Sequence, residues 1–173
     1  MPISGTWREH LDVIMKLPRT IRLDPSDTRV FHIAAEPGAW AVTGTFGFVD
    51  AIPGEMDNKA QLAFKSGWLG LDNFGYSTFV QVSVVPEDEA EAAARSLAEH
   101  LYRDFGAPDM LLAMTAAKSE IAYAASLCEH PAGTLLSIER EMTDDGITER
   151  IRIVPRPDDE GGHAQIWTLS EDC

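Results

Sequence analysis

Cys128 and His130 are the pair of residues in this chain most suggestive of chemistry, because cysteine near histidine can form a thiol nucleophile or part of a metal site. Residues two apart on a helix lie about 200° apart around its axis, so these side chains do not converge unless the helix has already ended. Structural metal sites also use four ligands, and no second Cys/His pair of ligand spacing follows. We therefore interpret Cys128 as structural and His130, just before Pro131, as a helix-ending residue with binding as its alternative role.

The other potential ligands form no recognisable site. The acidic clusters at residues 87–91 and 158–160 lack the spaced ligands and central glycine of a calcium loop. The glycines at 67, 70 and 75 follow a predicted helix, whereas glycine loops that bind phosphate precede one. G-x-S-x-G and H-E-x-x-H motifs are absent from the sequence. The sequence thus predicts no metal, no cofactor and no particular reaction, and leaves open whether the protein is an enzyme.

Residues 64–79, FKSGWLGLDNFGYSTF, form the aromatic segment, with five aromatic residues and three glycines. Phe64 and Phe79 belong to a flanking helix and strand, where we expect them in the core. The glycines allow tight bends, so the remaining rings cannot all turn inward. Large apolar side chains on a connection need a core, a ligand or another subunit. We predict that Trp68, Phe74 and Tyr76 line an interface, most simply with a second copy of the chain, and core packing is the alternative.

Composition and charge limit the classes of protein to which this chain can belong. The chain has 173 residues and a formal net charge of −14. One domain of this length can bury its own core, and its charge repels phosphate backbones and anionic membranes. We find neither a run of 18 apolar residues nor a signal peptide, and two cysteines are too few for a disulfide framework. We expect a cytoplasmic protein that binds neither nucleic acid nor membranes.

The elements that must position these residues follow from periodicity and turn signals. We predict one α+β domain over residues 15–157, with a mainly antiparallel sheet and about three helices packed on one face. Residues 1–14 read as an N-terminal appendage and 158–173 as an acidic linker and tail. The predicted strands are 19–23, 30–34, 40–48 and 77–85, the helices 57–65, 86–105 and 108–127, and the hairpin strands 134–142 and 147–154. We expect the open face of the hairpin to carry Glu139, Glu141, Glu149, Arg150 and Arg152 as cross-strand pairs.

Three segments together resemble an uncharacterised proteobacterial family, a domain of unknown function. They are RTIRLDPSDT (19–28), FKSGWLG with FGYSTF (64–79) and SLCEHPAGTLL (126–136). The resemblance covers about residues 15–155, so both predicted appendages fall outside it. The resemblance assigns to this chain no activity, no catalytic residue and no cofactor.

Two functions of different classes remain. The first is a non-catalytic accessory or adaptor protein that self-associates, as a dimer, through the aromatic segment and also has a possible protein partner. The second is a small-molecule-binding protein or enzyme, with a pocket between the 68–76 loop and the helix end at Cys128–His130. A closed aromatic cavity favours the second hypothesis, and an open apolar patch favours the first.

Overall fold

Two antiparallel sheets form the framework of the structure, a computed structural model that describes residues 14–155. The four-stranded sheet has the order β1 (Lys16–Ile21), β5 (Phe79–Val84), β6 (Leu135–Thr143), β7 (Gly146–Val154). The three-stranded sheet has the order β2 (Ala41–Val42), β3 (Trp68–Gly70), β4 (Tyr76–Ser77). The helices are α2 (Asp27–Val30), α3 (Asn58–Ser66), α4 (Glu87–Asp104) and α5 (Met110–Ser126), with 3₁₀ turns η1 (Thr45–Phe48) and η2 (Pro53–Glu55). The predicted α+β class is confirmed, and the tail at 158–173 and nearly all of the N-terminal appendage lie outside the described residues.

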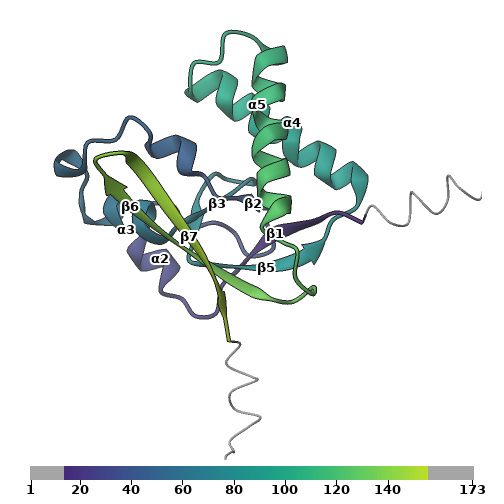
Figure 1. Cartoon of the computed structure of the whole chain (residues 1–173), viewed down its shortest axis with the longest axis horizontal. Coiled ribbons are helices and arrows are strands. Elements are labelled where there is room, and N and C mark those ends of the chain that lie inside the picture. The colour runs from purple at the N-terminus through teal and green to yellow at the C-terminus, as the bar shows by residue number, and fades with distance from the viewer. Residues whose placement is uncertain (1–13, 156–173) are drawn as a thin grey trace, which may run out of the picture.

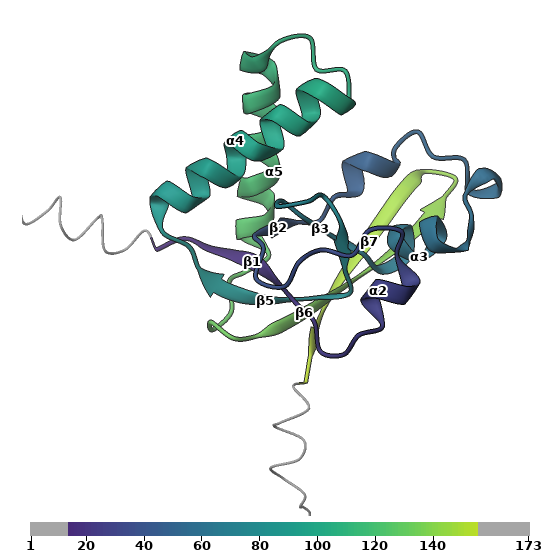
Figure 2. The ribbon, with the colours of Figure 1, turned by 180° about the vertical axis from the view of Figure 1, so that it is seen from behind.

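The helices α4 and α5 form a hairpin that stands out from the sheets (Figures 1 and 2). Three acidic residues occupy the first turn of α4, where they complement the helix dipole, as the sequence predicts. The Asp109 carboxylate accepts the Leu112 N–H at 2.8 Å and so begins α5. Leu97, Ala113 and Ala117 are fully buried and belong to one apolar cluster with Leu17 of β1. Apolar packing therefore joins the two helices to each other and to the sheet.

The predicted hairpin of β6 and β7 is confirmed, with one residue on the wrong face. Gly146 closes the turn with φ +118°, a conformation that favours glycine. Glu139 forms ion pairs with Arg150 at 3.8 Å and Arg152 at 3.4 Å on the open face. Glu149 lies instead opposite Arg140, on the inner face, because side chains alternate along a strand. The inward direction of Glu149 matters for the site described below.

Two other predicted strands are wrong. Val30 ends the short helix α2, and residues 31–34 contribute only an isolated bridge between Ala34 and Tyr76. Within residues 40–48, only β2 is extended, because Gly44 adopts φ +83° and turns the chain into η1. A side chain at Gly44 would place its Cβ 2.7 Å from the Leu69 Cβ. The alternation of large and small residues over 40–48 therefore does not mark one continuous strand face.

Candidate functional site

Trp68 lies in the core, which corrects the prediction that it lines a surface. Its side chain is fully buried, because β3 pairs with both β2 and β4 and is enclosed by the four-stranded sheet. The indole packs in one apolar cluster with Ala41, Val80, Val82, Cys128, Leu136 and Ile138. Its Nε1–H is buried without a hydrogen-bond partner. Trp68 thus takes the alternative that the sequence left open, core packing.

Tyr76 is half-buried between two phenylalanine rings. Its ring centroid lies 6.0 Å from that of Phe31 and 6.0 Å from that of Phe48. Burial raises the pKa of the Tyr76 hydroxyl, and nearby Arg140 opposes this shift. The residue joins a small core that also contains Phe64, so most of its ring is not available to a partner.

Phe74 is the aromatic residue of the predicted three that stays near a surface. It has φ 57°, unusual for a non-glycine residue, and the side-chain oxygen Oδ1 of the neighbouring Asn73 accepts the Gly75 N–H at 2.9 Å. Its ring stacks on the imidazole of His100, with centroids 3.8 Å apart and planes 6° apart. Phe105 packs edge-on against the same imidazole at 5.2 Å. Through the His100 ring, Phe74 therefore connects the aromatic segment to the C-terminal end of α4.

Cys128 and His130 do not form a reactive pair. The Cys128 side chain is 1% exposed, and burial raises the pKa of its thiol to about 12. His130 is half-buried, and its backbone carbonyl accepts the Lys16 ammonium at 2.6 Å. Because Cys128 and Trp68 pack in the same buried cluster, core side chains fill the place where the sequence suggested a ligand pocket.

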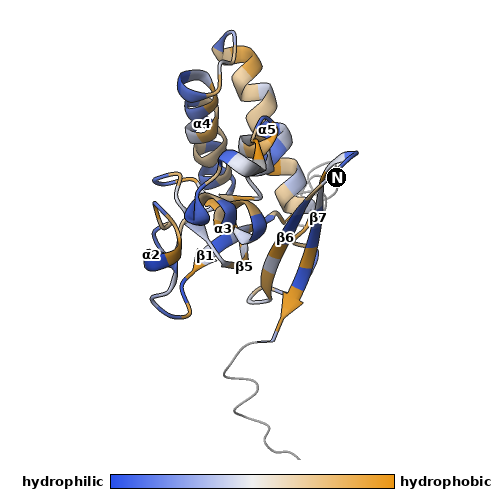
Figure 3. Cartoon of the chain, turned by 90° about the vertical axis from the view of Figure 1, so that its left-hand side faces the viewer, coloured by the Kyte–Doolittle hydropathy of each residue, from blue (hydrophilic) through white to orange (hydrophobic). Residues whose placement is uncertain are grey.

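An exposed apolar surface lies at the tip of the helical hairpin, where sequence reasoning did not look. We define the tip surface as Tyr102, Phe105, Met110, Leu111 and Leu112, all at least 40% exposed. Leu111 is the most exposed large apolar residue among those described, at 77%. The hydropathy colouring shows α5 as apolar along much of its length up to this tip (Figure 3). The signal was available in the sequence, since α5 has only two charged residues among 17.

A buried arginine organises a second group that sequence reasoning missed. Arg140 is 4% exposed, and its guanidinium donates to the carbonyl oxygens of Ala63 at 3.2 Å and Phe64 at 2.8 Å. It also donates to the carbonyl oxygen of Thr43 and, at 2.7 Å, to the Thr45 hydroxyl. Both carbonyls belong to the last turn of α3, where the Ala63 oxygen also accepts the Gly67 N–H at 2.9 Å. Arg140 therefore joins α3, the 43–45 segment and β6.

Glu149 balances the charge of Arg140 and completes the polar cluster, which we define as Thr45, Glu120, Tyr123, Arg140 and Glu149. The Thr45 hydroxyl donates to one carboxylate oxygen of Glu149, and the Tyr123 hydroxyl donates to the other at 2.7 Å. Burial and the Glu149 charge raise the pKa of Glu120, and burial with the same hydrogen bond raises that of Tyr123 to about 12. The phenol therefore keeps its proton at neutral pH. A polar groove of about 570 Å³ adjoins Arg140 and Glu149 along β6 and β7.

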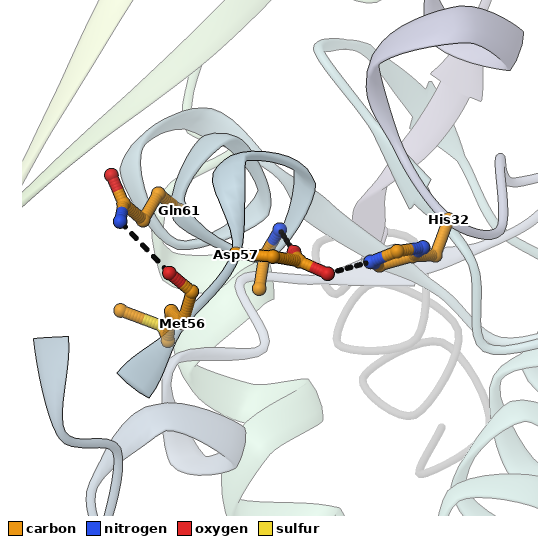
Figure 4. Close-up of polar contacts among 5 residues, drawn as sticks. His32, Met56, Asp57 and Gln61 are labelled. Atoms are coloured by element: carbon orange, nitrogen blue, oxygen red, sulfur yellow. Dashed lines mark hydrogen bonds and ion pairs between the residues drawn. The ribbon is translucent and has the colours of Figure 1, made fainter. Parts of the chain in front are cut away.

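His32 and Asp57 resemble a catalytic dyad only in residue type. The His32 Nε2 lies 2.8 Å from an Asp57 oxygen, and the two side chains are 60% and 61% exposed (Figure 4). The other Asp57 oxygen accepts the Ala60 N–H at 2.8 Å, which begins α3. The Ala60 hydrogen bond, followed by that of His32, lowers the pKa of Asp57. The geometry is that of a helix cap with an exposed ion pair.

The segments that resemble the family form hydrogen bonds that hold the fold together. The Asp27 carboxylate of the first segment is buried and accepts the Thr78 hydroxyl of the second at 2.6 Å. The Ser77 hydroxyl donates to the Phe79 carbonyl oxygen at 2.7 Å. Within residues 14–155, no three His, Cys, Asp or Glu side chains gather as a metal site would require, and no helix there is long and apolar enough to cross a membrane.

Comparison with protein families identifies the chain. A family model described as a family of unknown function (DUF6505) matches residues 15–168, and the chain belongs to that family. The match begins where the sequence predicted, but it extends past residue 155, where we expected it to end. Comparison with curated proteins and with solved structures gave no match.

Proposed function

We propose that this family member is a non-catalytic adaptor that associates with a second copy of itself through the tip surface and the exposed face of α5. One observation carries the proposal. The buried face of α5 is apolar, with Ala113, Ala117 and Ile121, while its exposed face also carries Leu111 and Leu112. The other exposed positions of α5 include small and polar residues, so the large apolar side chains gather at its start, where an exposed apolar patch is typical of an interaction site. Among the described residues, nothing covers this outer face of α5.

The charge distribution supports a second copy as the occupant. The chain carries a formal net charge of −14, so two copies repel each other across most of their surfaces. α4 has eight charged residues among 18, whereas α5 has two among 17. Of these two helices, α5 is thus the one that a like-charged copy can approach more closely. Two helical hairpins related by a two-fold axis would form a four-helix bundle, a common arrangement for such elements.

Burial of the tip leucines favours association. Complete burial of a fully exposed leucine contributes about 1.5–3 kcal/mol, so Leu111 and Leu112, which are 77% and 51% exposed, together contribute about 2–4 kcal/mol in each copy. Phe105 and Tyr102 add aromatic area at the end of α4, and Phe74 supports Phe105 through the shared His100 ring. The predicted interface role of the aromatic segment is thereby retained for Phe74. Contact through the hairpin leaves both sheets accessible to another protein, as an adaptor requires.

The test is the oligomeric state across a concentration series. We expect the wild type to sediment as a dimer and the Leu111→Glu, Leu112→Glu double variant to sediment as a folded monomer with an unchanged circular dichroism spectrum. Leu62→Glu is the matched control, because Leu62 is 40% exposed on another helix, α3. This variant should remain dimeric. A wild type that is monomeric at its highest soluble concentration, or a double variant that still dimerises, would contradict the proposal.

Binding of a small molecule is the second candidate function, and the groove beside Arg140 and Glu149 favours it. Its walls carry both signs of charge, so the expected ligand is polar and carries groups of both signs. Mass spectrometry of protein purified under native conditions tests this function. A retained ligand that is lost in Glu149→Gln and kept in Leu111→Glu would support it, and the absence of any retained ligand would count against it.

A further inference from the structure

His100, about one turn before the end of α4, carries an imidazole that packs against two phenylalanine rings. The ring of Phe74 stacks on the imidazole, with centroids 3.8 Å apart and planes 6° apart. Phe105 packs edge-on against it at 5.2 Å, and Phe46 of η1 packs edge-on against Phe105 at 5.3 Å. The His100 side chain is only 16% exposed. One titratable ring therefore joins the segment 71–75, between β3 and β4, to the tip surface, of which Phe105 is a member.

Two charged groups of α4 act on this imidazole. The Nδ1 of His100 lies 3.1 Å from a carboxylate oxygen of Asp104, so the neutral ring donates from Nδ1 and takes up a further proton at Nε2. Burial lowers the pKa of His100, the charge of Asp104 opposes this shift, and that of Arg103 adds to it. Asp104 is 56% exposed, so solvent screens its attraction. The segment 71–75 contributes one charged residue, the exposed Asp72, and η1 contributes none. The packing thus favours the neutral imidazole.

The segment that stacks on the imidazole has a conformation that needs support. Phe74 has φ 57°, which a bulky side chain rarely adopts. Asn73 fixes the backbone on both sides, because its side-chain nitrogen donates to the Ala34 carbonyl at 3.1 Å and its Oδ1 accepts the Gly75 N–H at 2.9 Å. Loss of the stack on His100 would leave this strain in place without a contact that offsets it. Strained residues of this kind are found at switch regions.

We propose that His100 is a pH-sensitive link, whose protonation separates it from Phe74 and Phe105 and thereby loosens the tip surface. A proton on Nε2 places a full charge among aromatic rings, where little water can hydrate it. The cation–π attraction of the Phe74 ring offsets only part of this cost, in agreement with the lowered pKa of His100. The open form therefore binds the proton more strongly than the packed form, and a pH that falls below about 6.5 favours the open form.

Hydrogen exchange followed by mass spectrometry tests this link in the full chain with the Leu111→Glu, Leu112→Glu background, which keeps the measurement independent of dimerisation. Exchange rates are corrected for the intrinsic pH dependence of amides. From pH 7.5 to 5.5, the opening of residues 101–107 should increase about three- to tenfold, because an open imidazole one unit below its ordinary pKa is charged about ten times more often than neutral. His100→Gln should abolish this increase. His32→Gln is the matched control, since His32 is 60% exposed, and should retain it.

Asp104→Asn is a second variant, in which the titrating ring remains. A nuclear magnetic resonance titration should show a lower pKa of His100 than in the wild type, because the substitution removes the carboxylate that stabilises the imidazolium. The rise in opening at pH 5.5 should be at least as large as in the wild type. Opening that is independent of pH in the presence of His100, an equal rise in His100→Gln, or a His100 pKa at or above about 6.5 would each overturn the proposal. Where His100→Gln does not fold, the titration and the Asp104→Asn exchange decide.

Weaker association in acid is the consequence that rests on the proposed function. Relative to His100→Gln, the wild-type dimer should dissociate more readily at pH 5.5 than at pH 7.5 in sedimentation. The comparison with His100→Gln is needed because the carboxylates of both proteins also lose charge as the pH falls. Equal changes of the dissociation constant in the two proteins would overturn the link between His100 and the tip surface. An absence of dimers at both pH values would contradict only the proposed function, because the exchange measurement is made on the monomer.

Discussion

Arg140→Met should destabilise the protein strongly, because the arginine is buried and holds three segments together. The guanidinium donates to three backbone carbonyls and to the Thr45 hydroxyl. Methionine keeps much of the apolar stem but supplies no donor, so the acceptors lose their hydrogen bonds from the guanidinium and Glu149 loses the favourable charge of Arg140. The Ala63 carbonyl keeps the Gly67 N–H as a donor. The sum of four charge-assisted hydrogen bonds overstates the effect, since the desolvation cost of the arginine is also removed.

The expected loss is about 3–5 kcal/mol in the free energy of unfolding, the range for breaking a buried charged group away from its partners. For a domain of this size, each kcal/mol lowers Tm by about 2–4 °C, so Tm should fall by about 6–20 °C. Urea unfolding followed by circular dichroism measures the free energy, and an unchanged slope against urea shows that the unfolded state is not altered.

Arg150→Met is the matched control on the neighbouring strand. Its side chain is 68% exposed and makes one ion pair at 3.8 Å, so its loss should cost at most about 1 kcal/mol. Equal effects of the two substitutions would refute the assignment of Arg140 as a buried organising residue. A cycle with Glu149→Gln should give a coupling of about 0.5–3 kcal/mol, because Thr45 links the two charged groups.

Two further outcomes follow from the core. Trp68→Ala should cost about 3–5 kcal/mol in urea unfolding, whereas Phe74→Ala should cost clearly less, because Trp68 is fully buried and Phe74 is partly exposed; equal costs would contradict these positions. Cys128 should react slowly with a thiol reagent at pH 8 in the native protein and rapidly in urea, and rapid native labelling would show that the thiol is accessible. Because burial raises its pKa from 9.0 to about 12, its contribution to stability is complete below about pH 9 and is lost as pH rises toward 12.

Local signals in the sequence predicted the elements that depend on nearby residues. The acidic first turn and apolar stripe predicted α4, and Asp144-Asp145-Gly146 predicted the hairpin, because both patterns lie within a few residues of the element that they specify. The segment 40–48 could not be predicted in this way. Its break depends on Gly44 approaching Leu69, a contact between residues far apart in the sequence.

The inward positions of Arg140 and Glu149 in the polar cluster could be predicted from the sequence, because side chains alternate between the two faces along a strand. Ile138 and Arg140 share one face of β6, and Ile147, Glu149 and Ile151 share one face of β7, so both charged residues point inward with apolar neighbours. A charged residue at an inward position requires a buried partner. The identity of the carbonyls that bind Arg140 was not accessible, because α3 meets β6 only in the folded chain.

The glycines of the aromatic segment explain why its predicted surface became core. From the sequence we interpret these glycines as bends that force rings outward, whereas in the structure Gly70 and Gly75 allow two segments to approach closely. A Cβ on Gly70 would lie 2.9 Å from the Ala35 Cβ, and one on Gly75 would lie 2.6 Å from the Ala34 carbonyl carbon. Residues 33–35 therefore pack directly on β3 and β4. Glycine next to aromatic residues indicates tight packing as readily as exposure. The large apolar residues at the start of α5 are different, because no described residue packs over them. The proposed interface therefore lies on α5 and not on the aromatic segment.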